Sequence, residues 1–457
     1  MREGWDASLV AGCIDRNGKF IDGSQIMHLV PHKGALYAAN GYWQDKHNIW
    51  YGGKDSRSGW AQILKLSGPG EPWVVDLDMG PQHLRPELLK SVTFTRDAEG
   101  RLLSAPDTIL IAATYDGPGG RGISFFVRND ETGSWTKSKI INGDTGARGE
   151  NNSVRAAAVY RDRVTGREKL FVSVGVLGIY AGSYDPSRPG KVNWEQAPEY
   201  GGTRTRVLSI VEANDSLFFS EGTRIFRRVD GPMPRYIEVA DMSAEVNADT
   251  SRDAFQSIGG IRGLSAIAGP VPGRQSLIFL WAAGTKSQGC VERLDPRPDG
   301  SYARVQETCL ADLISQHLDG APIAYVLGAY SNFLPVIDLG SKTQLHLIGL
   351  EAFIPASPRG RAYQQLTARN QRSGKGGFYA GAMYALRDAQ AHWRVGEVNG
   401  RYQPGQPEPV SIYTYALSPF SEPGRQTIYL GGYDPNFFPS SDTAWVFSTD
   451  LTNLVGR

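Results

Sequence analysis

Several titratable side chains stand in polar, glycine-rich stretches, where binding and catalytic groups are common. His47 and Asp45 lie in GYWQDKHNIWYGG, and His83 lies in GPQHLRPELLK. Glu351 and Asp434 each follow an apolar run, QLHLIGL and TIYLGGY. Histidine can take or give a proton near neutral pH because its ordinary pKa lies there. These five residues are therefore our candidates for acid–base chemistry.

Four cations recur at matching places in the chain and favour a site for an anionic ligand. One polar residue stands at or near the start of each of seven short apolar segments: Gln25, Lys90, Arg155, Arg206, Arg262, Tyr325 and Tyr413. Arginine binds carboxylate, sulfate or phosphate groups through two parallel hydrogen bonds. The alternative is that each cation pairs with an acid from a neighbouring repeat. The candidate acids are Asp78, Asp144, Glu150, Glu199, Glu238 and Asp253.

These residues could together catalyse β-elimination at a uronic acid. A cation neutralises the carboxylate and acidifies the C5 proton, a base removes that proton, and an acid protonates the leaving oxygen. Arg155 and Arg206 are our candidates for the cation. His83 and His47 are candidates for the base, and Tyr413 or Tyr325 for the acid.

Glycoside hydrolysis is the alternative chemistry. It needs two carboxylates a few ångströms apart across the bond, and the best pair is Glu351 and Asp434, with Asp45 close by. No nucleophile elbow, P-loop, zinc-protease or dinucleotide motif occurs. We expect no cofactor and no catalytic metal. A structural Ca²⁺ could bind the Asp/Asn-rich NGDTGARGENN, although no EF-hand spacing supports it.

The segment GYWQDKHNIWYGG combines aromatic and polar residues between glycines. Tyr42, Trp43 and Trp50, with Phe437 from GGYDPNFFPSSDT, could stack on the apolar faces of sugar rings. We expect Arg85 to join the same binding surface. The aromatics would equally suit a protein partner, because Tyr, Trp and Arg dominate protein–protein binding energy. A third interpretation is that they only hold a long loop against its strands.

The elements that must position these residues form a repeat. Short β-type runs occur at intervals of roughly 50–85 residues, long for a minimal propeller blade but compatible with loop insertions. The runs are 35–41, 108–117, 169–178, 216–222, 276–284, 344–352 and 427–434. Each follows another apolar segment and precedes a third strand, a tight turn and a fourth strand with an aromatic. These aromatics are Trp73, Trp135, Trp194, Tyr236, Tyr302 and Trp393.

The seventh repeat lacks its fourth strand, and the N-terminus has a segment of the missing form. REGWDASLV carries Trp5 in the expected place. The sequence therefore predicts an all-β fold, a seven-bladed β-propeller of four-stranded antiparallel blades, forming one domain over residues 1–457. A strand at about 3–11 completes the last blade at about 411–451, which leaves no free sheet edge. Ligands of such folds usually bind around the central funnel.

The motif NDETGSW and the Gly-Gly pair of IYLGGYD resemble kelch and Asp-box propellers. The rhythm of the repeat covers most of the chain, whereas the motifs cover only a few residues per blade. Those families include sugar oxidases, sialidases, lyases and binding scaffolds. The resemblance therefore implies a propeller architecture and no particular activity.

The composition is that of a turn-rich globular chain. Of 457 residues, 54 are Gly and 27 are Pro, and 47 aromatic residues (10 Trp, 20 Tyr and 17 Phe) supply core material. A net charge of +1 gives no bulk reason to expect nucleic-acid or membrane-surface binding. No apolar run is long enough to cross a bilayer. We expect a monomer whose ligand is an acidic carbohydrate.

The cysteines bear on the compartment. Cys290 and Cys309 flank CVERLDPRPDGSYARVQETC, and a hairpin centred on PRPDG would place them opposite each other. We expect a disulfide, the alternative being two buried thiols on neighbouring strands. A disulfide implies an oxidising compartment, so we expect a secreted or periplasmic protein whose signal sequence has been removed, because MREGWDASLV has no signal-peptide pattern. Cys13 is expected to be a small buried hydrophobic residue.

The functional expectation is a secreted carbohydrate-active propeller that binds an acidic, uronate-type saccharide and cleaves it by β-elimination. A glycoside hydrolase and a non-catalytic lectin or protein-interaction propeller are the alternatives. A lectin should repeat its ligand contacts in several blades. Here the long loops differ from one another and cluster on neighbouring blades, which favours one asymmetric site and hence an enzyme.

Overall fold

The computed structural model describes most of the chain. The described ranges are 4–42, 60–81, 83–117, 122–147, 149–203, 205–246, 260–284, 288–328, 332–360, 377–398, 409–422, 424–436 and 442–455. Six of the residues that the sequence nominated lie outside them, namely Trp43, Asp45, His47, Trp50, Asp253 and Phe437.

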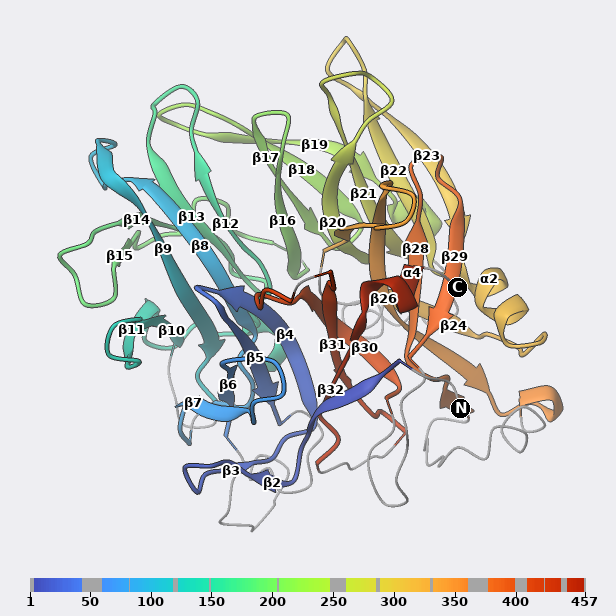
Figure 1. Cartoon of the computed structure of the whole chain (residues 1–457). Coiled ribbons are helices and arrows are strands. Elements are labelled where there is room, and N and C mark those ends of the chain that lie inside the picture. Colours follow the sequence, from blue (N-terminus) through green and yellow to red (C-terminus); the bar gives the residue numbers. More distant parts are fainter. Residues whose placement is uncertain are drawn as a thin grey trace. The chain divides into compact units, whose positions relative to one another are not determined.

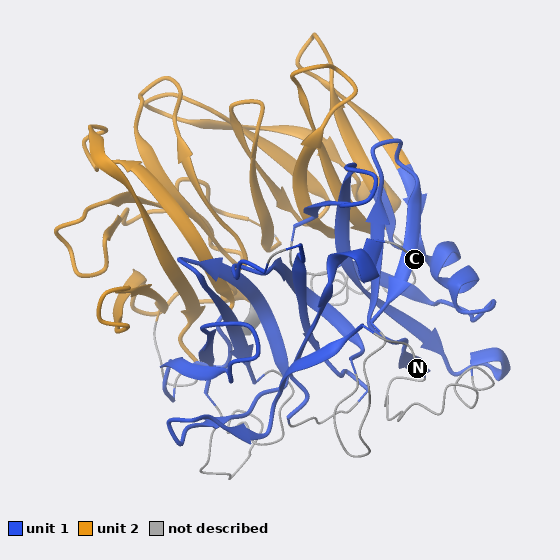
Figure 2. Ribbon diagram, viewed as in Figure 1, with its two compact units in different colours: residues 1–86, 285–291, 307–457 blue, residues 87–284, 292–306 orange. Residues whose placement is uncertain are grey.

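The described strands form seven antiparallel sheets, six of four strands and one of four strands with two more paired to it (Figure 1). The fold is an all-β propeller of seven four-stranded blades, which confirms the predicted fold class. The chain divides into two compact units (Figure 2). The first comprises residues 1–86, 285–291 and 307–457, and the second comprises residues 87–284 and 292–306. The expectation of a single domain stays a prediction.

The first unit holds three of the sheets, a short ribbon and two helices. One sheet comprises β4 (Gln25–His32), β5 (Ala35–Gly41), β6 (Gln62–Leu66) and β7 (Val74–Asp78). Another comprises β24 (Tyr325–Gly328), β26 (Gln344–Pro355), β28 (Met383–Arg387) and β29 (Trp393–Glu397), with β25 (Leu334–Ile337) and β27 (Gly377–Tyr379) also on β26. The third comprises β30 (Ser411–Leu417), β31 (Thr427–Tyr433), β32 (Trp445–Asp450) and β1 (Asp6–Val10). The ribbon is β2 (Cys13–Ile14) with β3 (Phe20–Ile21), and the helices are α2 (Leu310–His317) and α4 (Leu451–Val455).

The other four sheets lie wholly or mainly in the second unit. They are β8 (Leu88–Arg96), β9 (Leu102–Tyr115), β10 (Gly122–Arg128) and β11 (Trp135–Asn142); β12 (Ala157–Arg161), β13 (Glu168–Val174), β14 (Gly178–Tyr184) and β15 (Val192–Trp194); β16 (Val207–Ala213), β17 (Ser216–Glu221), β18 (Arg224–Val229) and β19 (Arg235–Asp241); and β20 (Gly260–Ala268), β21 (Gln275–Ala282), β22 (Cys290–Pro296) and β23 (Tyr302–Cys309). Two 3₁₀ turns, η2 (Gly149–Asn152) and η3 (Ser243–Glu245), join them.

Strand β31 shows why the predicted runs are apolar throughout. Ile428 and Leu430 pack into one buried cluster with Trp5, whereas Tyr429 packs into another with Ile26. Successive side chains of a strand point to opposite faces of the sheet. A strand with a neighbouring sheet on each side must therefore be apolar on both faces, and this removes the alternation expected of a half-exposed strand.

The N-terminal strand completes the last sheet, as the sequence predicted. β1 pairs antiparallel with β32, with Asp6 opposite Ser448 and Val10 opposite Trp445. Trp5, directly before β1, is 6% exposed and packs in the core of this sheet. Pairing the first strand with the last links the chain's two ends within one sheet.

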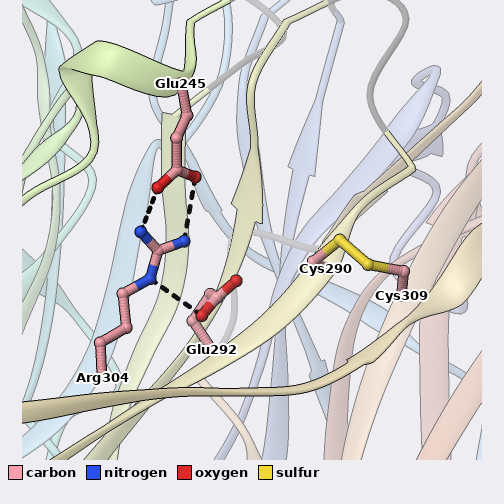
Figure 3. The surroundings of a disulfide bond; sticks show 5 residues. All are labelled: Glu245, Cys290, Glu292, Arg304 and Cys309. Atoms are coloured by element: carbon pink, nitrogen blue, oxygen red, sulfur yellow. Dashed lines mark hydrogen bonds and ion pairs between the residues drawn. A yellow bond between two sulfur atoms is a disulfide. The ribbon is translucent and has the colours of Figure 1, made fainter.

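The disulfide is present and joins Cys290, at the start of β22, to Cys309, at the end of β23 (Figure 3). The prediction from the spacing is confirmed. The expectation for Cys13 was wrong, because this residue is exposed on the two-residue strand β2. The two-residue strand β2 is exposed along its whole length, since Ile14, its other residue, is 69% exposed.

Replacing Cys290 and Cys309 together with alanine is expected to lower the free energy of unfolding by about 3 kcal/mol. The bond links residues 19 apart, and opening a loop of that length increases the entropy of the unfolded chain. Urea unfolding without reductant measures the change. Adding reductant should destabilise the wild type and leave the double variant unaffected; equal stability of the two proteins without reductant would contradict the prediction.

In the first unit, a buried ion pair lies beside a histidine that is uncharged at neutral pH. Arg387 donates two hydrogen bonds to Glu307, at 2.6 and 2.8 Å, and the indole of Trp393 donates a third at 3.1 Å. His346 stands directly opposite Arg387 on β26 and is 9% exposed. Burial, and then the charge of Arg387, lower the pKa of His346 to about 4, although Glu307 acts in the other direction.

This histidine should make stability depend on pH. The unfolded chain binds a proton at His346 below its ordinary pKa near 6.5, whereas the folded protein resists protonation down to about 4. The free energy of unfolding should therefore fall as the pH falls through this window, by about 2.5 kcal/mol at pH 4.5 from this group alone. In H346Q, the difference in urea stability between pH 7 and 4.5 should shrink by that amount. H392Q, which removes an exposed histidine from β29's turn, is the matched control; an unchanged pH dependence in H346Q would contradict the assignment.

Candidate functional site

Glu351 is the centre of a buried group of hydroxyls in the first unit. It lies on β26 and is 7% exposed. Its Oε2 accepts hydrogen bonds from Ser411, at 2.8 Å, and from Tyr433, at 3.1 Å. Two hydroxyl donors on one oxygen match an ionised carboxylate, which only accepts hydrogen bonds. Ser411 and Tyr433 stand opposite each other on β30 and β31, so the neighbouring sheet supplies both donors.

A second tyrosine extends this group toward the surface. The rings of Tyr433 and Tyr413 pack against each other, with centroids 4.7 Å apart. Tyr413 is half-buried, whereas Tyr433 is 6% exposed. A partly exposed phenol thus lies against the phenol that donates to the buried carboxylate.

The position of Tyr413 depends on an irregularity in β30. Ile412 pairs with Gly432 and Thr414 pairs with Gly431, so Tyr413 is an extra residue between two consecutive pairs. Such a β-bulge turns a side chain away from the direction that strict alternation would give it. The bulge is a local reason why Tyr413 lies beside Tyr433.

Two further tyrosines pack near the carboxylate. The hydroxyls of Tyr325 and Tyr379 are hydrogen-bonded at 2.8 Å. Burial, and then the charge of Glu351, raise the pKa values of Tyr325, Tyr379 and Tyr433. These phenols therefore stay protonated at neutral pH, which leaves Glu351 as the group of this cluster that can take up a proton.

Asn436 holds one of these tyrosines in place. Its Oδ1 accepts the backbone N–H of Tyr379 at 2.7 Å, and its Nδ2 donates to the carbonyl of Tyr379 at 3.0 Å. Asp434 is completely buried, and its Oδ1 accepts the backbone N–H of Asn436 at 3.0 Å. Asp434 thus shapes the turn that carries Asn436. A carboxylate in this position is poorly suited to act directly on a glycosidic bond.

In the second unit, one of the predicted cations has an acidic neighbour that the sequence did not suggest. Arg155 lies 3.5 Å from Glu87, and both side chains are almost completely buried. The second carboxylate oxygen of Glu87 accepts the backbone N–H of Val154 at 2.8 Å. None of the six acids nominated from sequence is this partner. Glu199, one of those six, instead pairs with Arg228 at 2.7 Å.

The remaining cations of this group are also turned inward. Arg206 and Arg262 are each 3% exposed. Arg206 donates to the hydroxyl of Ser153 at 3.5 Å, just before the segment that carries Arg155. Lys90 lies within β8, where its ammonium donates to the carbonyl of Ala157, and burial lowers its pKa. Arg155 and Arg206 therefore lie close to one stretch of chain, residues 153–155. Their convergence on one anion site stays a prediction.

Three other described candidates lie next to the first sheet and are buried as well. Tyr42 is completely buried, His83 is 1% exposed and Arg85 is 3% exposed. The backbone of Tyr42 donates to the carbonyl of Leu84 at 2.9 Å, so residues 83–85 run beside the end of β5. None of these contacts indicates that His83 transfers a proton. Its role as a base stays a prediction.

No cluster of three or more metal-binding side chains occurs within the described ranges. No helix in this part of the chain is long and apolar enough to cross a membrane. The residues that sequence reasoning missed are Ser411, Tyr379, Asn436 and Glu87. Their common feature is that each makes its contact across neighbouring strands or sheets, which a linear pattern does not register.

Comparisons with known proteins leave the family open. No protein-family model and no curated protein matches the chain. One similar solved structure is the crystal structure of a thermostable family-43 glycoside hydrolase, at 11% identity and a TM-score of 0.32, over 97% of this chain and 92% of that chain. Another is the crystal structure of the N-terminal domain of Nup159, at 8% identity and a TM-score of 0.42, over 98% and 94%. We draw no functional argument from likeness at this level, and no match places the chain among kelch or Asp-box propellers.

Proposed function

We propose that this protein binds an acidic, uronate-type saccharide and cleaves it by β-elimination, using Tyr413, Tyr433 and Glu351 as a proton relay. The observation that supports the proposal is the hydrogen bond from Tyr433 to Glu351 together with the packing of half-buried Tyr413 against the ring of Tyr433. A relay of this kind lets a buried carboxylate exchange protons with a ligand that only the outer phenol touches.

The elimination balances with these groups alone. Tyr413 oxygen takes the C5 proton while its own proton passes to Tyr433 and that of Tyr433 passes to Glu351. The electron pair left at C5 forms the C4–C5 double bond and expels the C4 oxygen. The reverse transfer, from Glu351 through both phenols, returns one proton to that oxygen. The products are an unsaturated uronate and a new hydroxyl end, and the protein is regenerated.

The geometry favours elimination over hydrolysis by a carboxylate pair. Glu351 has hydroxyl donors on Oε2, and half-buried Tyr413 packs against one of them, Tyr433. Asp434 is completely buried and holds the turn at Asn436. A glycosidase needs both carboxylates at the scissile bond, and Asp434 does not have that freedom.

The other parts of the proposal extend the expectations from sequence. For the second unit by itself, we propose that the cations Lys90, Arg155, Arg206 and Arg262 bind an anionic group. The protein acts as a monomer without a cofactor and without nucleic-acid or membrane partners. The disulfide supports a secreted or periplasmic location, because such bonds persist in oxidising compartments.

A panel of uronate-containing polysaccharides tests the function. The expected result is a rise in the ultraviolet absorbance of unsaturated uronate with at least one member of the panel. New reducing ends without this absorbance would indicate hydrolysis and overturn the proposal. Binding to a glycan or to a protein with neither signal would favour a lectin or an interaction scaffold.

A further inference from the structure

A buried carboxamide in the first sheet has no partner. Gln25, the first residue of β4, is 1% exposed. Neither its Oε1 nor its Nε2 has a hydrogen-bond partner within the described part of the chain. A buried polar group that stays unsatisfied costs free energy, and the few such groups in folded proteins call for a physical explanation.

The strand registers give Gln25 a defined place. Gln25 pairs with Gly41 and Ile26 with Asn40, and Met27 is then an extra residue before the next pair. β30 has the same irregularity two residues after Ser411. Gln25 therefore occupies in β4 the position that Ser411 occupies in β30.

These two strands are neighbours in the first unit. Ser411 uses this position to donate to Glu351, the last group of the proposed relay. Gln25 thus stands at the strand end of the adjacent sheet, in the position that corresponds to a member of the candidate site. This corresponding position is the second observation, beside the unsatisfied amide, that relates Gln25 to the candidate site.

Gly41 leaves room for this arrangement. A Cβ at Gly41 would lie 3.3 Å from Nε2 of Gln25 and 2.7 Å from the Cβ of Arg85. The second distance is shorter than real side chains allow, so only glycine lets Arg85 and Gln25 pack here together. Glycine at position 41 thus permits the close approach of the amide of Gln25 and the side chain of Arg85 to this strand.

We propose that the carboxamide of Gln25 recognises a pair of neighbouring hydroxyls on a sugar ring of the ligand. A carboxamide offers one acceptor and a donor group side by side, and two adjacent hydroxyls offer the complementary donor and acceptor. A carboxylate would satisfy only the donor. The inference rests on the proposed saccharide ligand and adds that its neighbouring hydroxyls are the groups that Gln25 binds. It does not depend on the elimination chemistry.

The test compares two ligands of equal charge by calorimetry, without turnover. One is the uronate oligosaccharide that binds most tightly, and the other is an oligoaspartate, which has no hydroxyls. Q25M keeps the length of the side chain and removes its polar atoms. We expect Q25M to weaken saccharide binding at least tenfold, to leave oligoaspartate binding unchanged and to unfold thermally at the same temperature as the wild type or higher.

Gln62 provides the matched control. It is 4% exposed in the same sheet, and its amide is paired: Nε2 donates to Phe20 O at 2.9 Å and Oε1 accepts from Asn40 at 3.2 Å. Q62M should therefore lower the unfolding temperature, in contrast to Q25M. The proposal is overturned if the wild type binds no saccharide, if Q25M binds the saccharide normally, if it loses both ligands alike, or if it is destabilised like Q62M. If no panel member yields unsaturated uronate but Q25M still loses saccharide affinity, the elimination fails and this inference stands.

Discussion

Replacing Arg228 with methionine is expected to lower the free energy of unfolding by about 3–5 kcal/mol. Arg228 is 4% exposed and contacts three carboxylates. It donates to Glu199 at 2.7 and 3.3 Å, to Asp162 at 2.8 Å and to Asp230 at 2.6 Å. Methionine would preserve most of the apolar packing and leave these acids together without the cation that binds them.

The acids cannot easily escape this loss. Tyr160 donates to Asp230 at 2.6 Å, and Tyr236 donates to Glu199. Burial by itself raises the pKa of Asp162, but hydrogen bonds from backbone N–H groups and from Arg228 lower it below its ordinary value. Without Arg228, the three carboxylates must either repel one another or take up protons at neutral pH. Both outcomes destabilise the folded protein.

Urea unfolding at neutral pH measures the effect. R188M is the matched control, because Arg188 has a 53% exposed side chain and lies 3.9 Å from Asp185. Exposed pairs contribute little, so R188M should change the free energy of unfolding by less than about 0.5 kcal/mol. Similar losses in the two variants would show that the Arg228 pairs add nothing beyond an ordinary surface contact.

The strands of this fold were predictable because their burial has a simple consequence in sequence. A strand with a sheet on each side is apolar on both faces, so β5 coincides with the predicted 35–41 and β31 begins at the predicted residue 427. The closing strand was predictable for a related reason. A last repeat that lacks its fourth strand must obtain this strand from elsewhere in the chain. Trp5 identified the N-terminal segment as that strand.

The registers within the strands were not predictable. Alignment of the repeats placed Tyr413 with Gln25 and Arg206, whereas the pairing places Ser411 with Gln25. In β16 the extra residue is Leu208, so Arg206 also corresponds to Ser411. A bulge adds a residue without changing the apolar pattern, and a linear reading therefore shifts by one or two positions.

The partners of the charged groups were the least predictable part. Arg155 pairs with Glu87, 68 positions earlier in the chain, because β8 and β12 are neighbours. Tyr379 follows a long insertion, so its position in the sequence does not indicate where it lies in space. Its contacts with Asn436 define its place. Such pairs depend on distances of a few ångströms between elements, whereas the repeat specifies only which elements are adjacent.

Replacing Glu351 with glutamine, or Tyr413 with phenylalanine, is expected to lower kcat for uronate elimination by about 10²–10⁴-fold. Glutamine keeps the shape of Glu351 but cannot take up the proton that Tyr433 passes on. Phenylalanine keeps the ring of Tyr413 and its contact with Tyr433 but removes the hydroxyl that would touch the ligand. KM should change little, because neither substitution removes a charged contact assigned to ligand binding.

Two controls separate proton transfer from structural damage. Y429F changes a buried tyrosine of β31 that lies outside the relay and should keep most of the wild-type kcat. S411A removes a hydrogen bond to Glu351 but leaves the path through Tyr433 intact, so its kcat should fall less than that of Y413F. Equal losses in Y413F and Y429F, or a loss in Y413F confined to KM, would argue against the relay. A graded order, with E351Q and Y413F most impaired, S411A intermediate and Y429F near wild type, follows only if the proton passes along these three side chains.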